Sequence, residues 1–316
     1  MYYLGIDLGG TNMAAGIVNE AFEIVKKGST PTRAQRDADA ILQDMGRLCT
    51  GLMAEAGISR EEIAYVGIAS PGTVDPERGV LVRSYNLPFV NYPICEALKR
   101  YCPLDRVYLE NDANAAALGE AMGGAARGAK LSVMITLGTG IGGGVILDGK
   151  IYSGFNYAGA ELGHMVIAYD GVPCTCGRKG CWEAYSSATG LVRMTKEKMA
   201  DCADTLMWAL CGGDLAKASA RTAFDAAKKD DRAGAEVVDA YIRYLACGVT
   251  NIINIFQPDV LSIGGGICNE GDYLLKPLTA IVEKDQYTRS NAIKTKICIA
   301  ELGNDAGILG AAALGL

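Results

Sequence analysis

One histidine and three cysteines lie close together in the stretch GHMVIAYDGVPCTCGRKGC. His164 is the only histidine among the 316 residues, and Cys174, Cys176 and Cys181 follow it in the same stretch. One imidazole and three thiolates are a complete ligand set for zinc, which binds four such atoms in a tetrahedron at about 2.0–2.3 Å. The composition of this stretch therefore predicts a zinc site.

The predicted zinc site would be structural. Four protein ligands leave no open position for a catalytic water, and closed sites of this kind contribute on the order of 10 kcal/mol of local folding free energy. Gly177 and Gly180 can adopt positive φ, which would let the backbone fold back around an ion. Two alternatives remain: a loop in which the four residues are close by coincidence, and a redox pair of Cys174 and Cys176.

Three glycine runs indicate phosphate chemistry. In DLGGTN, Gly9 and Gly10 would let backbone N–H groups converge on an anion, and Thr11 adds a hydroxyl donor. Asp7 stands just before this turn and could hold Mg²⁺, directly or through water. The second run, TLGTGIGGG, offers Gly138, Thr139 and Gly140 in the same pattern.

The third glycine run, SIGGGI, follows an apolar strand. It contains Gly264, Gly265 and Gly266, against whose bare backbone a base or a ribose could press. Any one run could equally serve a tight hairpin or close strand packing, but together they favour a nucleotide site. Neither GxxxxGK[ST] nor a GxGxxG that opens a βαβ unit is present, which disfavours a P-loop and a Rossmann site.

The elements that must position these residues form one internal repeat. The stretches YYLGIDLGGTNMAAGIVN and SVMITLGTGIGGGVILDG each predict strand, glycine turn and strand. Strands are also expected at 65–70, 106–110 and 294–302. Helices are expected near residues 37–56, 92–101, 111–122, 184–199, 204–210, 216–228 and 233–256, from 272 onward, and in the tail 305–316. Alternating strands and helices predict an α/β fold with mixed sheets.

Size and charge narrow the possible functions. A chain of 316 residues with 50% hydrophobic residues is long enough for two cores, because single cores stop growing at about 250–300 residues. A net charge of −6 without a basic run argues against nucleic acid as a partner, since that surface needs clustered Lys and Arg. No apolar run approaches the roughly 18 residues of a membrane-spanning helix, and no export signal follows Met1. We therefore expect a cytoplasmic protein with a small-molecule partner and mostly reduced cysteines.

Several motifs together resemble those of the ROK family of bacterial sugar kinases, and within it the glucokinases. They are GIDLGGTN, ENDANAAALGE, TLGTGIGGGVILDGKIYSG, GAELGHM, CTCGRKGCWEAYSS and LSIGGGI. The resemblance runs from the first strand to the C-terminal helix. It implies two actin-like (ribonuclease H-like) domains around a central cleft. The small domain is expected at residues 1–113 plus about 303–316, and the large domain, with the zinc loop, at 114–302.

The resemblance also implies residue roles. Asp112, at a strand-to-helix corner where the helix dipole favours the ionised carboxylate, would be the catalytic base. Substrate ligands would be Gly72, Asn86, Asn111, Asp112 itself, Glu161, His164 and Glu183, with the histidine using the ring nitrogen that the metal leaves free. Purely structural roles remain as alternatives. They are a helix cap for Asp112, exposed helix-start carboxylates for the two glutamates, a plain turn for Gly72 and a loop cap for Asn86. ATP would lie on the glycine runs; the family often has lysine where this chain has Asn12, so no lysine contact to phosphate is expected there.

The implied activity is ATP-dependent phosphorylation of the 6-hydroxyl of a hexose, with glucose expected, in a homodimer or larger assembly. Kinases for N-acetylmannosamine, N-acetylglucosamine, allose or fructose are alternatives, because their ring contacts would be nearly the same. A sugar-sensing ROK repressor is a further alternative, but repressors carry a helix-turn-helix before this body and here the first strand begins at residue 2. An actin-like structural filament is also disfavoured, because a filament would not need the zinc loop.

Overall fold

The computed structural model describes all residues 1–316, and their contacts divide them into two compact units. The first unit contains Met1–Met134, Gly144–Ala160 and Ala300–Leu316; the second contains Ile135–Gly143 and Glu161–Ile299. The domain boundary predicted after residue 113 stays a prediction. No helix is both long enough and apolar enough to cross a membrane.

The first unit is built on a mixed five-stranded sheet of order β3-β2-β1-β4-β8. Its strands are β1 (Tyr2–Leu8), β2 (Asn12–Asn19), β3 (Ile24–Pro31), β4 (Ile63–Ser70) and β8 (Val107–Asn111). β1 and β2 form the predicted antiparallel hairpin, whereas β4 runs parallel to both β1 and β8. The carboxyl ends of β1, β4 and β8 therefore meet at one edge of the sheet, where Asp7 and Asn111 lie.

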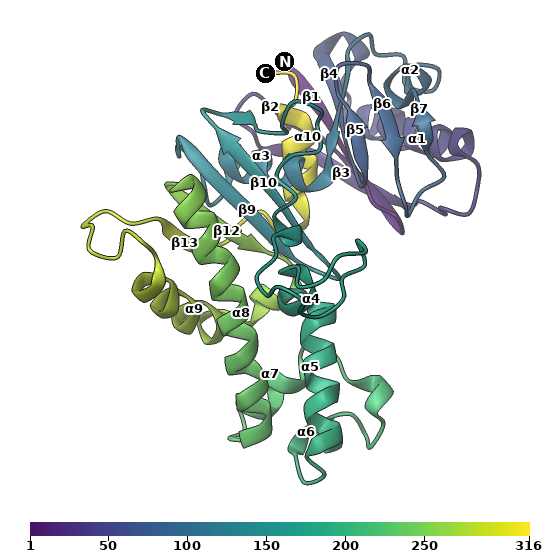
Figure 1. The fold of residues 1–316 in the computed structure, drawn as a ribbon. Coiled ribbons are helices and arrows are strands. Elements are labelled where there is room, and N and C mark those ends of the chain that lie inside the picture. The colour runs from purple at the N-terminus through teal and green to yellow at the C-terminus, as the bar shows by residue number, and fades with distance from the viewer. The chain divides into compact units, whose positions relative to one another are not determined.

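Helices cover both faces of this sheet because side chains alternate along each strand. Leu4, Ile6 and Leu8 of β1 pack in one core with helix α1 (Ala38–Ala56), whereas Tyr3 packs with helix α10 (Ala306–Ala313). Figure 1 shows α10, in yellow, against the purple strand β1. Helix α3 (Asp112–Gly123) packs beside α10.

The approach of α10 to the sheet depends on glycine. A Cβ at Gly67 of β4 would lie 1.8 Å from the carbonyl oxygen of Ala311. A Cβ at Gly5 of β1 would likewise lie 2.0 Å from the carbonyl oxygen of Ile308. Only glycine permits this helix-to-strand distance, so the C-terminal helix completes the core of the first unit.

A second five-stranded sheet has the order β11-β10-β9-β12-β13. Its strands are β9 (Leu131–Leu137), β10 (Ile141–Leu147), β11 (Lys150–Ile151), β12 (Val260–Gly264) and β13 (Lys296–Ile299). A small third sheet consists of β5 (Thr73–Asp75), β6 (Val80–Arg83) and β7 (Val90–Tyr92). Both larger sheets combine parallel and antiparallel pairs, as predicted for a mixed α/β fold.

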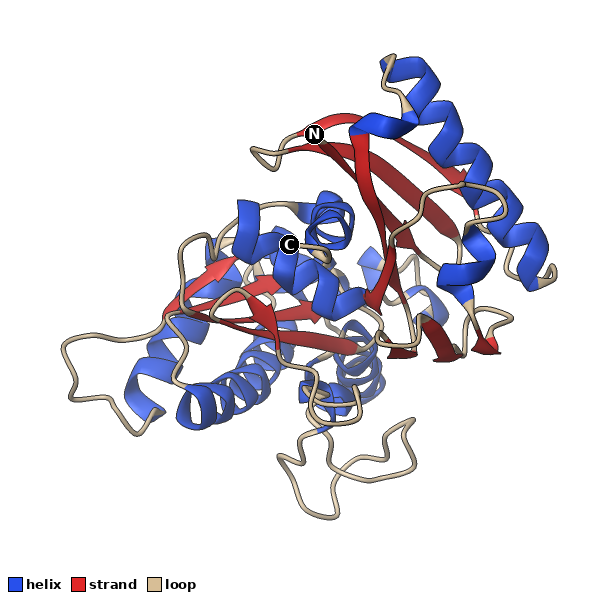
Figure 2. Ribbon diagram, turned by 90° about the horizontal axis from the view of Figure 1, so that it is seen from above, coloured by secondary structure: helices blue, strands red, loops and turns tan.

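The remaining helices are mostly in the second unit, and Figure 2 shows helices in blue along the red strands. The α-helices are α2 (Ile94–Leu98), α4 (Glu183–Ser186), α5 (Ala188–Asp201), α6 (Leu206–Leu210), α7 (Thr222–Ala227), α8 (Arg232–Phe256) and α9 (Asp272–Asp285). The short 3-10 helices are η1 (Arg60–Glu62), η2 (Leu162–His164), η3 (Leu215–Lys217), η4 (Gly266–Glu270) and η5 (Gly303–Asp305).

Three predicted helices are shorter or broken. The helix expected at 184–199 is interrupted at Ser187, which is extended and whose hydroxyl accepts the N–H of Gly190 to cap α5. The helix expected at 92–101 contains only Ile94–Leu98, because Tyr92 belongs to β7. The helix expected at 216–228 begins at Thr222, whose hydroxyl accepts the N–H of Ser219. Local side-chain hydrogen bonds of this kind compete with helix formation.

Candidate active site and metal centre

The first glycine turn joins β1 to β2 and closes on itself. The N–H of Gly9 donates to the carbonyl oxygen of Asn12 at 3.1 Å, and a Cβ at Gly9 would lie 2.6 Å from that oxygen. The N–H groups of Gly10 and Thr11 donate to no protein acceptor. The turn therefore has two adjacent free donors, and the N–H of Gly9 is not one of them.

Asp7 at the end of β1 is a carboxylate in an unfavourable environment. Burial, and after it the charge of Asp112, raise the pKa of Asp7 from 3.8 to about 6, and its carboxylate accepts no hydrogen bond from the protein. A cation would offset this desolvation and repulsion, and Mg²⁺ prefers carboxylate oxygens. The position fits the predicted magnesium ligand.

We expect Asp7→Asn to raise the unfolding temperature of the ligand-free protein by about 2–4 °C at pH 8. The folded state holds the Asp7 proton more tightly than the unfolded state, because the pKa rises from 3.8 to about 6 on folding. Its contribution to stability is therefore fully present below pH 3.8 and is lost as pH rises through about 6. Thermal unfolding followed by circular dichroism at several pH values measures this difference.

The gain from Asp7→Asn should shrink on acidification and disappear near pH 4. Asp105→Asn is the matched control, since the Asp105 side chain is 96% exposed and its replacement should give no such trend. Equal unfolding temperatures for Asp7→Asn and the wild-type protein at pH 8 would show that Asp7 is not strained by burial.

The corner between β8 and α3 holds Asn111 and Asp112. Asn111 is the helix cap: its Oδ1 accepts the N–H groups of Ala113 at 2.9 Å and Asn114 at 3.2 Å. Asp112 is the first helical residue, so the alternative in which it merely caps the helix does not hold. Burial raises the pKa of Asp112, partly offset by the N–H of Ala113, which donates to Oδ1 at 2.9 Å. A carboxylate with a raised pKa is a better proton acceptor.

Two further predicted substrate residues lie near this corner. The Nδ2 of Asn111 donates to the carbonyl oxygen of Gly72 at 3.2 Å. Gly72 has φ +115°, and a Cβ there would lie 2.2 Å from the carbonyl oxygen of Arg83, so the turn requires glycine. Asn86 lies against the first glycine turn, with its Cβ 3.3 Å from where a Cβ on Gly10 would be. The first unit thus gathers these residues around the carboxyl ends of its parallel strands.

Sequence reasoning missed Glu110, which supports this corner. Glu110 is buried, and its Oε1 accepts the N–H of Asn111 at 2.8 Å and an N–H of the Asn114 Nδ2 at 3.1 Å. Burial raises the pKa of Glu110 above its usual value, and these two bonds offset only part of that rise. The sequence feature that could have identified Glu110 is its position directly before the Asn-Asp pair, near the end of an otherwise apolar strand.

The second and third glycine runs lie beside each other in the second unit. Gly138 donates its N–H to the carbonyl oxygen of Gly140 at 3.0 Å, which leaves the N–H groups of Thr139 and Gly140 without protein acceptors. Gly265 has φ +95°, and a Cβ there would lie 2.3 Å from the carbonyl oxygen of Leu137. The second turn therefore resembles the first in having two adjacent free donors.

The ends of the third run differ in their surroundings. Gly264 is the last residue of β12 and is buried, whereas Gly266 begins η4. A Cβ at Gly266 would meet no atom within 4 Å, so protein packing does not require glycine there. Open space over Gly266 is compatible with the predicted contact to a nucleotide.

The histidine and the three cysteines come together as predicted. Their ligand atoms all lie within 4.8 Å of one another. The Nδ1 of His164 is 3.7 Å from the Sγ of Cys174, and the Sγ atoms of Cys176 and Cys181 are also 3.7 Å apart. A zinc tetrahedron with Zn–S bonds of about 2.3 Å has sulfur–sulfur edges of about 3.8 Å. The donor set and its spacing fit zinc.

The surroundings of Cys176 and Cys181 shift their thiol pKa values in opposite directions. Burial first, and then hydrogen bonding to Cys176 and Cys174, raises the pKa of Cys181 to about 12. The backbone N–H of Arg178 lowers the pKa of Cys176. A divalent ion bound by the three thiolates would offset the cost of burying the Cys181 thiolate.

A short hairpin holds the metal loop. The N–H of Cys174 donates to the carbonyl oxygen of Arg178 at 2.8 Å, and Gly180 has φ +76° with a Cβ position only 1.7 Å from the carbonyl oxygen of Ala168. Beyond Cys181, the fully buried Trp182 donates its Nε1–H to the carbonyl oxygen of Tyr244 on α8 at 3.0 Å. One end of the loop is therefore anchored in the core.

Glu183 connects the metal loop to the second glycine turn. Its Oε2 accepts the N–H of Ile141 at 2.9 Å, directly after Gly140. Its Oε1 lies 3.5 Å from the Oγ1 of Thr175 and 3.8 Å from the Sγ of Cys174. The contact with Ile141 was not predicted from the sequence. Glu161 precedes η2, and its carbonyl oxygen accepts the N–H of His164 at 3.0 Å.

Comparison with known proteins identifies the family. The model of the ROK family matches residues 3–316. The chain belongs to the ROK family. The prediction made from its motifs is thereby confirmed, and so is the α/β, actin-like fold class.

Several named relatives of this ROK protein are sugar kinases. It is 39% identical over 313 residues to a glucokinase of Thermotoga maritima, covering 98% of this chain and 96% of that one. It is 31% identical to an N-acetyl-D-glucosamine kinase of Aliivibrio salmonicida, with 100% of each chain covered. A ROK glucokinase from Streptomyces griseus, crystallised with glucose and AMPPNP, matches with a TM-score of 0.80 and 31% identity over 99% of both chains.

Proposed function

We propose that this ROK protein is an ATP-dependent hexose kinase that phosphorylates the 6-hydroxyl of glucose. Its similarity to glucokinases over nearly the whole chain supports this proposal. The environment of Asp112 is the observation that carries the mechanism, because Asp112 is a half-buried carboxylate beside Asn111 with a raised pKa and no competing role as helix cap. A phosphoryl acceptor needs such a group to take the proton of its hydroxyl.

The proposed chemistry assigns one role to each group of residues. Asn111, Asn86, the backbone of Gly72, Glu161 and Glu183 would bind sugar hydroxyls and orient O6. Asp112 takes the O6 proton as the bond from O6 to the γ-phosphorus forms and the bond from that phosphorus to the bridging oxygen breaks. ADP leaves with the electron pair of the broken bond. The reaction then follows the in-line geometry of phosphoryl transfer.

The phosphates would be held by backbone donors. The free N–H groups of Gly10 and Thr11, and those of Thr139 and Gly140, suit anionic oxygens. Gly9 shapes the first turn and Gly138 the second, while the run Gly264–Gly266 would accept the nucleoside. Asn12 supplies an amide at the position where the ROK family often has lysine. The amide could bind a phosphate oxygen but adds no charge.

Two metal ions belong to the proposal. Asp7 would hold Mg²⁺, which would neutralise charge on the phosphates. His164, Cys174, Cys176 and Cys181 would hold Zn²⁺, whose contribution would be to fix the loop that carries Glu161 and Glu183. Because Nδ1 of His164 faces the cysteines, Nε2 would keep its proton and donate to a sugar hydroxyl.

The substrate is the first thing to measure. We expect ATP-dependent ADP release with glucose, and a kcat/KM for glucose at least about tenfold above that for N-acetylglucosamine, N-acetylmannosamine, allose or fructose. A pocket that rejects one extra group typically discriminates by about 10–200-fold. A coupled assay of ADP release over this panel measures it.

Two results of the panel would contradict parts of the proposal. Preference for N-acetylglucosamine would favour the second candidate function, for which the N-acetyl-D-glucosamine kinase relative is the supporting observation. Absence of turnover with every sugar would refute the kinase.

We further propose a homodimer or larger assembly in the cytoplasm, and light scattering after size exclusion tests the assembly.

A further inference from the structure

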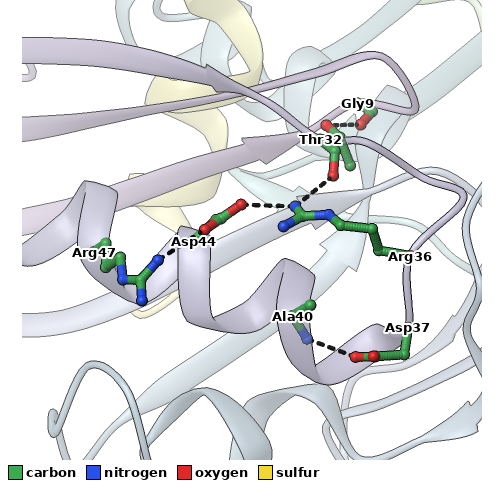
Figure 3. Close-up of polar contacts among 7 residues, drawn as sticks. All are labelled: Gly9, Thr32, Arg36, Asp37, Ala40, Asp44 and Arg47. Atoms are coloured by element: carbon green, nitrogen blue, oxygen red, sulfur yellow. Dashed lines mark hydrogen bonds and ion pairs between the residues drawn. The ribbon is translucent and has the colours of Figure 1, made fainter.

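Thr32 forms hydrogen bonds to two residues of the first glycine turn. It directly follows β3 and is fully buried. Its Oγ1–H donates to the carbonyl oxygen of Gly9 at 2.7 Å, a bond drawn in Figure 3, and its N–H donates to the carbonyl oxygen of Thr11 at 3.0 Å. One residue therefore fixes a carbonyl on each side of Gly10.

A hydrogen bond that fixes the carbonyl of one residue also fixes the direction of the N–H of the next residue. In a trans peptide the carbonyl oxygen of one residue and the N–H of the next point in opposite directions. Because Thr32 holds the carbonyl oxygen of Gly9, the N–H of Gly10 is turned away from Thr32. That N–H is one of the two donors of this turn that have no protein acceptor.

An ion pair fixes Thr32 in turn. The Nη2 of Arg36 donates to the carbonyl oxygen of Thr32 at 3.1 Å and to the Oδ2 of Asp44 at 2.6 Å. Asp44 lies on α1, and Asp37 caps that helix by accepting the N–H of Ala40 at 2.8 Å (Figure 3). The turn is thus connected to the first turns of a nineteen-residue helix.

The second glycine turn has a comparable support from another part of the chain. The Oγ1–H of Thr189 donates to the carbonyl oxygen of Thr139 at 2.7 Å, and the N–H of Ala188 donates to the carbonyl oxygen of Gly138 at 2.8 Å. By the same peptide geometry, these bonds turn the N–H groups of Gly140 and Thr139 away from α5. Both are donors without a protein acceptor.

We propose that Thr32 and Thr189 are positioning residues for the triphosphate, each orienting one free N–H group of its glycine turn, that of Gly10 or that of Gly140, without touching the nucleotide. The proposal rests on the proposed function. At each turn a threonine hydroxyl and a backbone N–H hold two carbonyl oxygens. Both donors belong to Thr32 at the first turn, whereas the N–H at the second turn is that of Ala188. Correctly oriented N–H groups lower the cost of binding an anion, because they need no reorganisation.

The test replaces each hydroxyl and leaves a similar volume. Thr32→Val and Thr189→Val should each raise the KM for ATP by about 2- to 12-fold, the equivalent of one hydrogen bond of 0.5–1.5 kcal/mol. The KM for glucose at saturating ATP should stay unchanged. Thr32→Ser and Thr189→Ser should restore the KM for ATP, because serine keeps the donor.

A matched control uses a threonine that bonds a carbonyl elsewhere. The Oγ1–H of Thr50 donates to the carbonyl oxygen of Gly46 within α1, far along the helix from the turn, so Thr50→Val should leave both KM values unchanged. Should buried Thr32→Val fail to fold, the exposed Thr189→Val still tests the second turn.

The outcomes separate this inference from the proposed function. Variants that raise both KM values alike, or that leave the KM for ATP unchanged in an active enzyme, would overturn the positioning role. If the wild-type protein phosphorylates no sugar, the proposed function fails instead. Calorimetric titration with AMPPNP then decides the positioning role: weaker binding to the valine variants supports it, and equal binding refutes it.

Discussion

Asp112→Asn should lower kcat by about 10²- to 10⁴-fold, the usual loss when a general base is removed. The amide keeps the size of the side chain but cannot accept the O6 proton. We expect the protein to fold normally, because Asn111 rather than Asp112 caps α3. The assay is coupled ADP release at saturating glucose and ATP, together with circular dichroism of the variant.

The pH dependence should change with this substitution. Burial raises the pKa of Asp112 above 3.8, so wild-type activity should fall as pH drops through that raised value, where the base becomes protonated. Asp112→Asn should lack this acidic limb. Asp272→Asn is the matched control, because Asp272 is an exposed acidic residue in the first turn of α9. Near-normal kcat in Asp112→Asn would remove Asp112 from the proposed mechanism.

Removal of the proposed zinc should raise the KM for glucose by about 10- to 150-fold and lower the unfolding temperature at the same time. The range corresponds to one charged hydrogen bond of about 1.5–3 kcal/mol lost to the sugar. The physical reason is that two proposed sugar ligands lie on the metal loop. His164 is close to Cys174, and Glu183 is close to Cys174 and Thr175, so loss of the metal should displace both. Chelated wild-type protein and Cys176→Ser should behave alike, with metal content measured by elemental analysis.

Cys247→Ser provides the control for the metal experiment. Cys247 is an exposed thiol on α8 that is not among the four clustered ligands, so its loss should change neither metal content nor sugar binding. Unchanged glucose affinity in protein shown to lack metal would separate the ion from the sugar site. Absence of stoichiometric zinc in active wild-type protein would refute the zinc assignment itself.

Local features of the chain could be predicted from the sequence. The two glycine hairpins and the metal ligands are each encoded within about twenty residues, where residue types and spacing determine the geometry. Asp112 was also predictable as a candidate, because a polar pair followed the strand that became β8. The resemblance to the ROK family then supplied roles for residues far apart in sequence, such as Gly72 and Glu183.

Contacts between distant segments could not be predicted. Thr32 reaches Gly9 only because β2 and β3 pair in a register that places Asn12 opposite Pro31, and no local pattern fixes that register. The bond from Ile141 to Glu183 likewise depends on how the metal loop folds back. The break at Ser187 was missed because a capping hydroxyl overrode helical periodicity.

The position of Glu183 has a consequence for the order in which substrates bind. One of its oxygens accepts the N–H of Ile141, next to the second glycine turn, and the other faces the metal loop. Under the proposed function, a hexose bound by this carboxylate would weaken or redirect the bond to the Ile141 N–H and so change the affinity of the second glycine turn for nucleotide. Because such linkage is reciprocal, nucleotide must change hexose affinity by the same factor. The proposed function therefore predicts that hexose and nucleotide affect each other's binding through the Glu183 side chain.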